Sequence, residues 1–289
     1  MRKTVLFGFL GALIFSGCAT RAPVTYPAYN TAPTVAVSAT ALSTATETPA
    51  GDYLVDNSQV FVRGSNYSEG GAAMLGLIGA IAGIAADRAN NASAVAEVKS
   101  QLSIKFVKDL NEALSRTTSL APFKGQLQLL APDTAADLLL LPYAVLETER
   151  EKRARLTFQI TSRFTSAENV RQKKTYAYAS PGVDTPVSWT ANDNAQIRQF
   201  SDVAFDRLTA TFVNDLAGKY RERVGVENRL FTTWQINPDG PVLKGFLLED
   251  AAGYQVVVPL FQEQPVSGFI LLVDRLFVKG GERQTALSR

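Results

Sequence analysis

The side chains that most often carry out covalent chemistry in proteins are nearly absent from this sequence. Its 289 residues include no histidine and a single cysteine, Cys18. Without histidine there is no Ser-His-Asp triad, no Cys-His dyad and no His-ligated zinc site. A lone cysteine forms neither an internal disulfide nor a multi-thiolate metal site. Most enzyme chemistries are therefore closed to this chain, and we predict no metal site and no cofactor.

The chemistry that remains would use a pair of carboxylates or a Ser-Lys dyad. Asp202 and Asp206 lie four residues apart, but both are offset from the apolar stripe around them. They are most simply solvated, with Arg198 one turn before Asp202 and Arg207 next to Asp206. Asp274 interrupts an apolar strand sequence, where pairing with Arg275 or with a neighbouring strand is the simplest explanation. No serine has the sequence context of a nucleophile elbow. We therefore predict that the protein is not an enzyme.

Aromatic residues offer a second kind of candidate site, a groove for a glycan or a peptide. Tyrosines in strands more often sit at the edge of a core with the hydroxyl in water, and we favour that explanation. The residues concerned are Tyr176, Tyr178, Trp189, Trp234 and Tyr254.

Cys18 ends a segment with the features of a secretory signal peptide. The chain starts with Met1-Arg2-Lys3, continues with an apolar run from Val5 to Phe15, and then reads Ser16-Gly17-Cys18. A cationic start, a short apolar stretch and small residues before a cut site distinguish such a signal from a membrane span. We predict that residues 1–17 are removed on export.

The tetrad Phe15-Ser16-Gly17-Cys18 resembles the lipobox of bacterial prolipoproteins, with Phe in place of the usual Leu. The resemblance covers only the first 18 residues. It implies that lipid is attached to Cys18, which becomes the first residue after cleavage, and that palmitate-type acyl chains bind the protein to a membrane. Ala19, in place of Asp, is similar to the pattern of lipoproteins sorted to the outer membrane, where this one would face the periplasm.

The charge balance argues against a nucleic-acid partner. Cleavage would remove Arg2 and Lys3 and leave 27 basic and 27 acidic residues. A nucleic-acid binder needs a basic face that replaces counterions on phosphates, and no block of like charge stands out. Short basic runs such as Arg171-Gln-Lys-Lys174 are typical of a solvated strand edge.

Residues 18–52 are rich in Ala, Thr, Pro and Ser. Such a stretch has few large apolar side chains to offset the entropy of ordering. The composition predicts a lipid anchor and a disordered tether, with an edge strand at Val35 and Val37 as the alternative.

The uncharged run 70–86 follows a short predicted strand at residues 59–63 within the segment 53–91. Gly79 and Gly83 are spaced GxxxG, and Gly76 lies close to the same helical face. Each glycine costs about 1 kcal/mol of helix stability relative to alanine, so a helix here needs a compensating contact. The run resembles glycine-zipper segments of bacterial envelope proteins. Three explanations stay open: self-association or membrane insertion, internal packing of a small-residue helix, and a flexible loop.

Hydrophobic periodicity predicts the remaining elements. From Ala92 to Ser115 and from Asn194 to Arg221, apolar residues recur at three- and four-residue steps, which indicates two amphipathic helices. Between them, three strands are predicted at 138–147, 156–164 and 174–179, and Pro142 indicates an edge or a bulge. Residues 92–225 should therefore form an α+β domain in which both helices cover one face of a β meander.

The last segment, residues 226–289, predicts a small antiparallel β unit and a mobile tail. The unit is either a separate domain or an extension of the first sheet. The predicted fold class is thus α+β: two long amphipathic helices on an antiparallel meander, followed by a small antiparallel unit, with a glycine-rich apolar helix near the N-terminus.

These features predict a lipid-anchored, non-catalytic envelope protein that acts as an interaction or assembly component in the periplasm. Residues 70–86 would supply the surface for an envelope protein partner or for self-association. The alternative is a membrane-perturbing or pore-related oligomer whose segment 70–86 enters the bilayer. A hydrolase that uses carboxylates or a Ser-Lys pair is the third possibility.

Overall fold

The computed structural model describes residues 24–38, 53–55, 58–64, 102–148, 154–221, 230–235, 242–261 and 263–279. The strands are β1 (Thr34–Val37), β2 (Tyr53–Leu54), β3 (Val60–Gly64), β4 (Gln128–Leu129), β5 (Leu138–Thr148), β6 (Ala154–Thr165), β7 (Arg171–Asp184), β8 (Phe231–Trp234), β9 (Leu243–Ala251), β10 (Tyr254–Phe261), β11 (Gln264–Pro265) and β12 (Phe269–Asp274). The α-helices are α3 (Val107–Ser119) and α4 (Pro186–Leu216), and short 3-10 helices span Ala121–Phe123 and Arg275–Phe277.

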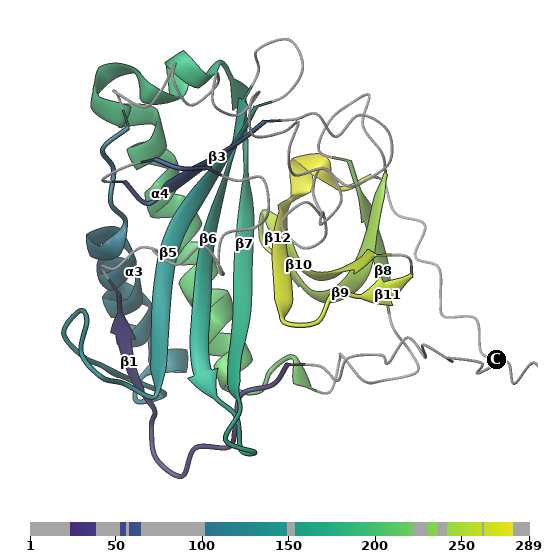
Figure 1. Ribbon diagram of the computed structural model, residues 1–289. Coiled ribbons are helices and arrows are strands. Elements are labelled where there is room, and N and C mark those ends of the chain that lie inside the picture. The colour runs from purple at the N-terminus through teal and green to yellow at the C-terminus, as the bar shows by residue number, and fades with distance from the viewer. Residues whose placement is uncertain are drawn as a thin grey trace, which may run out of the picture.

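One mostly antiparallel sheet runs through the described residues in the order β2-β3-β5-β6-β7-β12-β10-β9-β8, and both helices cover the same face of its central strands (Figure 1). The α+β class predicted from the sequence is therefore confirmed. Within the described part of the chain, no helix is both long enough and apolar enough to cross a membrane.

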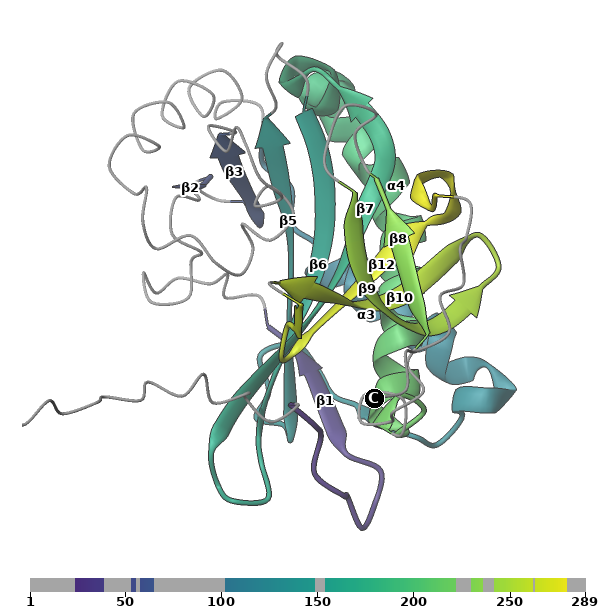
Figure 2. The ribbon, with the colours of Figure 1, turned by 90° about the vertical axis from the view of Figure 1, so that its right-hand side faces the viewer.

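The centre of the sheet is the long antiparallel meander β5-β6-β7. Strand β6 alternates apolar and polar residues, and Leu156, Phe158 and Ile160 are fully buried in the core beneath the helices. The solvated face that this alternation predicts is wrong, because the intervening polar side chains are at most 5% exposed: Thr157, Gln159 and Thr161. The β6–β7 hairpin ends in a tight turn, where the Ser166 N–H donates to the Val170 carbonyl at 2.8 Å. Figure 2 shows this turn at the same end of the sheet as the segment that leads into β1.

Pro142 lies at a gap in the edge pairing of β5. Strands β1 and β3 both pair in parallel with this edge, β1 with Leu138–Leu140 and β3 with Ala144–Thr148. The Leu140 carbonyl accepts from the Ser38 N–H, just after β1, and the Ala144 N–H donates to the Gln59 carbonyl, just before β3. Because alternate residues of a strand direct their backbone groups to the same side, residue 142 faces the interval between β1 and β3. A proline there leaves no N–H without a partner. The predicted edge strand or bulge is wrong, because β5 lies between β3 and β6 and pairs with β6 without a register shift; the interval between β1 and β3 accommodates the proline instead.

The C-terminal strands extend the first sheet. β12 pairs in parallel with β7, with Leu271 opposite Ala177, and β10, β9 and β8 follow in antiparallel order. The last described residues return to β8, where Trp234 and Val278 form an antiparallel bridge. A second apolar cluster, which includes Trp234, fills the face of these strands that lies away from the helices.

Helix α4 confirms the predicted second helix, with an earlier start and an earlier end. Its first turn is capped by Thr185, whose hydroxyl accepts from the Ser188 N–H at 3.1 Å. A kink follows, in which residues 192–194 all have positive φ. Asn and Asp tolerate this left-handed conformation better than other residues with a Cβ, which explains an Asn-Asp-Asn kink. The ring of Phe205 on α4 packs on the ring of Phe158 on β6, and both contact the ring of Phe106, the residue just before α3.

The first predicted helix is wrong over residues 102–106. These residues are not helical, and Leu102, Ile104 and Phe106 are buried while the residues between them are exposed. The segment is pinned by Gln59, whose N–H donates to the Ile104 carbonyl at 2.9 Å. Leu102 and Phe106 are four residues apart, so they fit a helical stripe as well as a two-residue period. Helix α3 starts at Val107 and continues to Ser119, beyond the predicted end.

The predicted tether is wrong for residues 24–38. Tyr26 is only 4% exposed, and β1 is buried between β4 and β5. Asp137 fastens the start of β1: its Oδ2 accepts from the Thr34 N–H at 2.8 Å and from the Thr34 hydroxyl at 2.7 Å. Pairing of the backbone with an existing sheet edge supplies the stabilisation that the small side chains lack.

Four residues singled out in the sequence lie outside the described residues: Cys18, Gly76, Gly79 and Gly83. The whole run 70–86 falls there as well.

Candidate functional site

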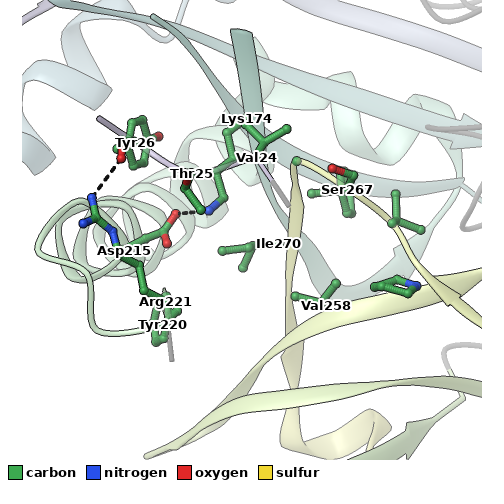
Figure 3. A pocket seen from close by; sticks show the side chains of 14 residues that line it. Val24, Thr25, Tyr26, Lys174, Asp215, Tyr220, Arg221, Val258, Ser267 and Ile270 are labelled. Atoms are coloured by element: carbon green, nitrogen blue, oxygen red, sulfur yellow. Dashed lines mark hydrogen bonds and ion pairs between the residues drawn. The ribbon is translucent and has the colours of Figure 1, made fainter. Parts of the chain in front are cut away.

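A buried polar cluster lies on the helix side of the sheet, at the end where the N-terminal segment enters the fold (Figure 3). Lys174 and Tyr176 come from β7, Asp215 from the last turn of α4, and Tyr26 from the segment before β1. The two-residue period of β7 places Lys174 and Tyr176 on the same face of the sheet. The short predicted strand edge at 171–174 is thus only partly solvated, because Lys174 is 8% exposed.

Asp215 is the centre of this cluster. Its Oδ2 lies 2.6 Å from the Lys174 ammonium and accepts from the Tyr176 hydroxyl at 2.5 Å. The Tyr176 hydroxyl in turn lies 2.9 Å from that of Tyr26. The Lys174 and Asp215 side chains are 10% and 5% exposed, so the ion pair is almost fully removed from water. The cluster thereby joins three distant segments of the chain.

The tyrosines of the cluster are held neutral. Burial, followed by the nearby Asp215 carboxylate, raises the pKa of Tyr26 and of Tyr176 well above 10. Neither phenol can therefore act as a base at neutral pH, and both are available as hydrogen-bond donors.

Beside the cluster is a cavity of about 150 Å³. Its walls are largely apolar and include Val24, Val258, Phe269 and Ile270, and the Lys174–Asp215 pair closes one side (Figure 3). Tyr220 and Arg221 lie at the end of α4 that borders it.

A Ser-Lys pair does occur in the structure, next to this cavity. Ser162 on β6 stands directly opposite Lys174 in the β6–β7 register, and both side chains are buried. A Ser-Lys mechanism needs the lysine as a free amine that takes the serine proton. The Lys174 ammonium is instead engaged by the Asp215 carboxylate. The arrangement therefore supports a role in holding the fold together rather than nucleophilic catalysis.

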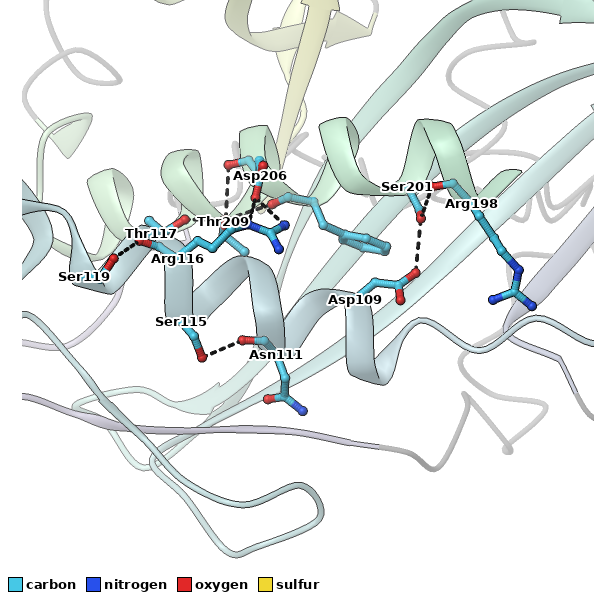
Figure 4. A network of polar contacts seen from close by, with 11 residues as sticks. Asp109, Asn111, Ser115, Arg116, Thr117, Ser119, Arg198, Ser201, Asp206 and Thr209 are labelled. Carbon is cyan, nitrogen blue, oxygen red and sulfur yellow. Dashed lines mark hydrogen bonds and ion pairs between the residues drawn. The ribbon is translucent and has the colours of Figure 1, made fainter. Parts of the chain in front are cut away.

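Asp206 contacts the other helix (Figure 4). Its carboxylate accepts from Arg116 of α3 at 2.8 Å, so its partner is Arg116 rather than the neighbouring Arg207 considered in the sequence. Both side chains of this pair are about half exposed, 49% and 51%, which is consistent with the predicted solvated position. Two further contacts, Asp109 with Ser201 at 3.1 Å and Thr117 with Thr209 at 2.8 Å, bind α3 to α4.

Asp274 pairs with α4, not with Arg275. The Arg207 guanidinium lies 3.2 Å from the Asp274 carboxylate and donates to the Tyr178 hydroxyl at 2.6 Å. It also lies over the ring of Tyr254, 5.0 Å from the ring centroid. Arg275 pairs instead with Asp250 at 2.6 Å. Asp274 is therefore the anchor of α4 on the C-terminal strands, in agreement with the structural role preferred for it.

The aromatic residues proposed for a groove are mostly in the core. Trp189, Trp234, Tyr176 and Tyr178 are at most 1% exposed, and the Trp189 indole donates to a backbone carbonyl of β6 at 2.9 Å. The alternative, tyrosines at the edge of the core with their hydroxyls in water, is also wrong for Tyr176 and Tyr178. The Tyr176 hydroxyl donates to Asp215, and the Tyr178 hydroxyl accepts from Arg207. Their burial was signalled in the sequence by the spacing of Lys174, Tyr176 and Tyr178, which share one face.

No group of three or more His, Cys, Asp or Glu side chains in the described ranges is arranged to hold a metal ion.

No protein-family model matches the chain, and no curated protein matches it closely enough to count as a relative. Among solved structures, a similar chain is a minor lipoprotein from Acinetobacter baumannii, determined at 2.35 Å. The two sequences are 16% identical, and the alignment covers 38% of this chain and 84% of that chain, with a TM-score of 0.24. A likeness of this size identifies neither a family nor a function.

Proposed function

We propose that the protein is a lipid-anchored, non-catalytic component of the bacterial envelope, attached to the outer membrane through Cys18 and facing the periplasm. The anchor is supported by the signal sequence and by the tetrad that ends at Cys18. Several acyl chains on one residue give lasting attachment, where a single chain gives only marginal binding.

The ion pair between Lys174 and Asp215 is the observation that supports a function without catalysis. It occupies Lys174, which stands opposite the buried Ser162, in a protein without histidine. Asp206 and Asp274, two of the three carboxylates considered in the sequence, contact arginines that fasten one element to another. The third, Asp202, is exposed on α4.

The body would act by binding an envelope protein, and residues 70–86 would supply the contact surface. The uncharged, glycine-spaced sequence of this run supports close approach of another helix. No nucleic-acid role is proposed, because the net charge of the mature chain is zero.

The experiment is a crosslinked pull-down from native envelopes with the intact chain and with a variant that lacks residues 70–86. A Gly79→Leu/Gly83→Leu variant blocks close helix approach, and Ala73→Leu/Ala85→Leu adds bulk to other faces of the same run as its control. The proposal predicts one stoichiometric partner that is lost on deletion and in the glycine variant but kept in the control. Recovery of the protein alone, as a defined multimer, would instead favour the pore-related oligomer. A monomer without a partner in every case would contradict both functions.

A further inference from the structure

The N-terminal segment is fixed to one end of the body. The Val24 side chain packs against Gly268, which has a φ of +71°, and a Cβ at that glycine would come within 3.2 Å of it. Two residues later Tyr26 is buried, and its carbonyl accepts from the Arg221 guanidinium at 2.8 Å. The chain therefore enters the fold at the end of the sheet that carries the β6–β7 turn (Figures 1 and 2).

The distance from this entry point to the proposed lipid is short. Cys18 and Val24 are six residue steps apart in the sequence, and an extended chain spans at most about 20 Å over that length. Strand β7 has 14 residues, which corresponds to about 45 Å from one end of the sheet to the other. A link of about 20 Å keeps the Val24 end near the bilayer. When the strands stand perpendicular to the membrane, the opposite end, where α4 begins, is about 45 Å farther away.

The surface at the Val24 end has the chemistry of a lipid headgroup contact. Arg171 and Lys173 are exposed at the base of the β6–β7 turn, and Val170 is 51% exposed beside them. Glu168 is the acidic residue of the turn itself. Exposed basic residues near an anionic leaflet are attracted to its phosphates, and an adjacent apolar side chain suits the interface.

We propose that the β6–β7 turn, with Val170, Arg171 and Lys173, docks on anionic phospholipid headgroups and sets the body upright on the membrane. This inference rests on the proposed lipid anchor at Cys18. It adds an orientation in which the Val24 end of the body faces the lipid. The sides of the body and the end where α4 begins remain available to an envelope protein.

The test uses the fact that Cys18 is the sole cysteine and would be blocked by lipid. A fluorescent thiol label is placed at Glu168→Cys in the turn or at Val187→Cys near the start of α4, both exposed positions. The lipidated protein is reconstituted into phosphatidylethanolamine–phosphatidylglycerol vesicles that contain a headgroup-attached quencher. The label at 168 should lose most of its emission, and the label at 187 should keep most of it.

Charge reversal then tests the headgroup contact itself. Arg171→Glu/Lys173→Glu should restore the emission of the label at 168, and Lys105→Glu/Lys108→Glu, the same change on an exposed part of the helix layer, should leave it quenched. Equal quenching of both labels, stronger quenching at 187, or insensitivity to Arg171 and Lys173 would overturn the docking. Failure of the purified protein to carry lipid is a separate result, read from its mass, and would remove the proposed function together with this inference.

Discussion

The carbonyl of Tyr26 accepts a hydrogen bond from Arg221 at 2.8 Å, which joins two residues that are 195 positions apart. The contact holds the entering N-terminal segment against the end of α4. Directly beside it, the hydroxyls of Tyr26 and Tyr176 lead to the Lys174–Asp215 pair. The end of the body nearest to Cys18 in sequence is therefore fastened by several mutually supporting polar contacts.

Replacement of Lys174 by Met should lower the free energy of unfolding by about 3–5 kcal/mol, because it leaves a buried carboxylate without its cation. The Lys174→Met/Asp215→Leu double variant should recover part of this loss, since no unpaired charge then remains. Urea unfolding measures both changes. The matched control is Lys108→Met, because the Lys108 side chain is 83% exposed and its ammonium lies 3.7 Å from the Glu112 carboxylate. A loss at position 174 no larger than at position 108 would contradict the account.

Alkaline pH should destabilise the protein through its buried tyrosines. The pKa of Tyr176 is raised by burial and by Asp215, so above pH 10 the unfolded chain releases a proton that the folded chain keeps. Stability should therefore be full below pH 10 and should fall as the pH rises above it. Tyr176→Phe should make this fall shallower. Tyr29 is the comparison, because burial raises its pKa only to about 12. Its contribution to the loss of stability should therefore be confined to the interval between pH 10 and pH 12. Urea midpoints measured across this range should show the difference, and identical slopes for wild type and Tyr176→Phe would count against it.

Acid should loosen β1. The pKa of Asp137 is lowered by the hydrogen bonds from the Thr34 N–H and hydroxyl. A folded pKa below the unfolded value means that this contribution is present above about 3.8 and is lost as the pH falls through the folded pKa. Asp137→Asn should weaken the attachment of β1 at neutral pH and remove its acid dependence. Hydrogen exchange of the Val35 and Val37 amides reports the effect. Unchanged protection in the variant would show that Asp137 does not hold the strand.

Gly245→Ala should cost about 1–3 kcal/mol, because the added methyl group has no space. A Cβ at Gly245 would lie 2.8 Å from the Val258 carbonyl and 3.0 Å from two ring carbons of Trp234. The carbonyl belongs to the paired strand β10, so it cannot move away without breaking the ladder. Thermal unfolding should show a lower Tm for the variant, and an unchanged Tm would mean that the strands adjust without cost.

The elements that were predictable are those whose pattern is local. The alternation around Phe158 predicts β6, and the stripe through Leu208 and Phe212 predicts α4. Residues 102–106 were misassigned because Leu102 and Phe106 fit two periods at once. The composition of residues 24–38 predicts a tether because it does not register contacts with distant segments: backbone pairing of Val35–Val37 with β5 and burial of Tyr26.

The candidate site was less predictable, since it depends on contacts between distant segments. Asp215 and Lys174 are 41 positions apart in the sequence and meet only when α4 folds back over β7. The partner of Asp274 is similarly remote, because Arg207 lies on the helix and Arg275 points elsewhere. The spacing of Lys174 with Tyr176 was the one local signal that this lysine faces the core.

The lipid anchor at Cys18 is tested by the intact mass of the protein purified from envelopes, together with the mass of its N-terminal peptide. We predict a chain that begins at Cys18 and carries acyl groups there, and an unprocessed, unacylated chain for Cys18→Ser. A mature protein with an unmodified thiol at Cys18, or one cleaved elsewhere, would contradict the account.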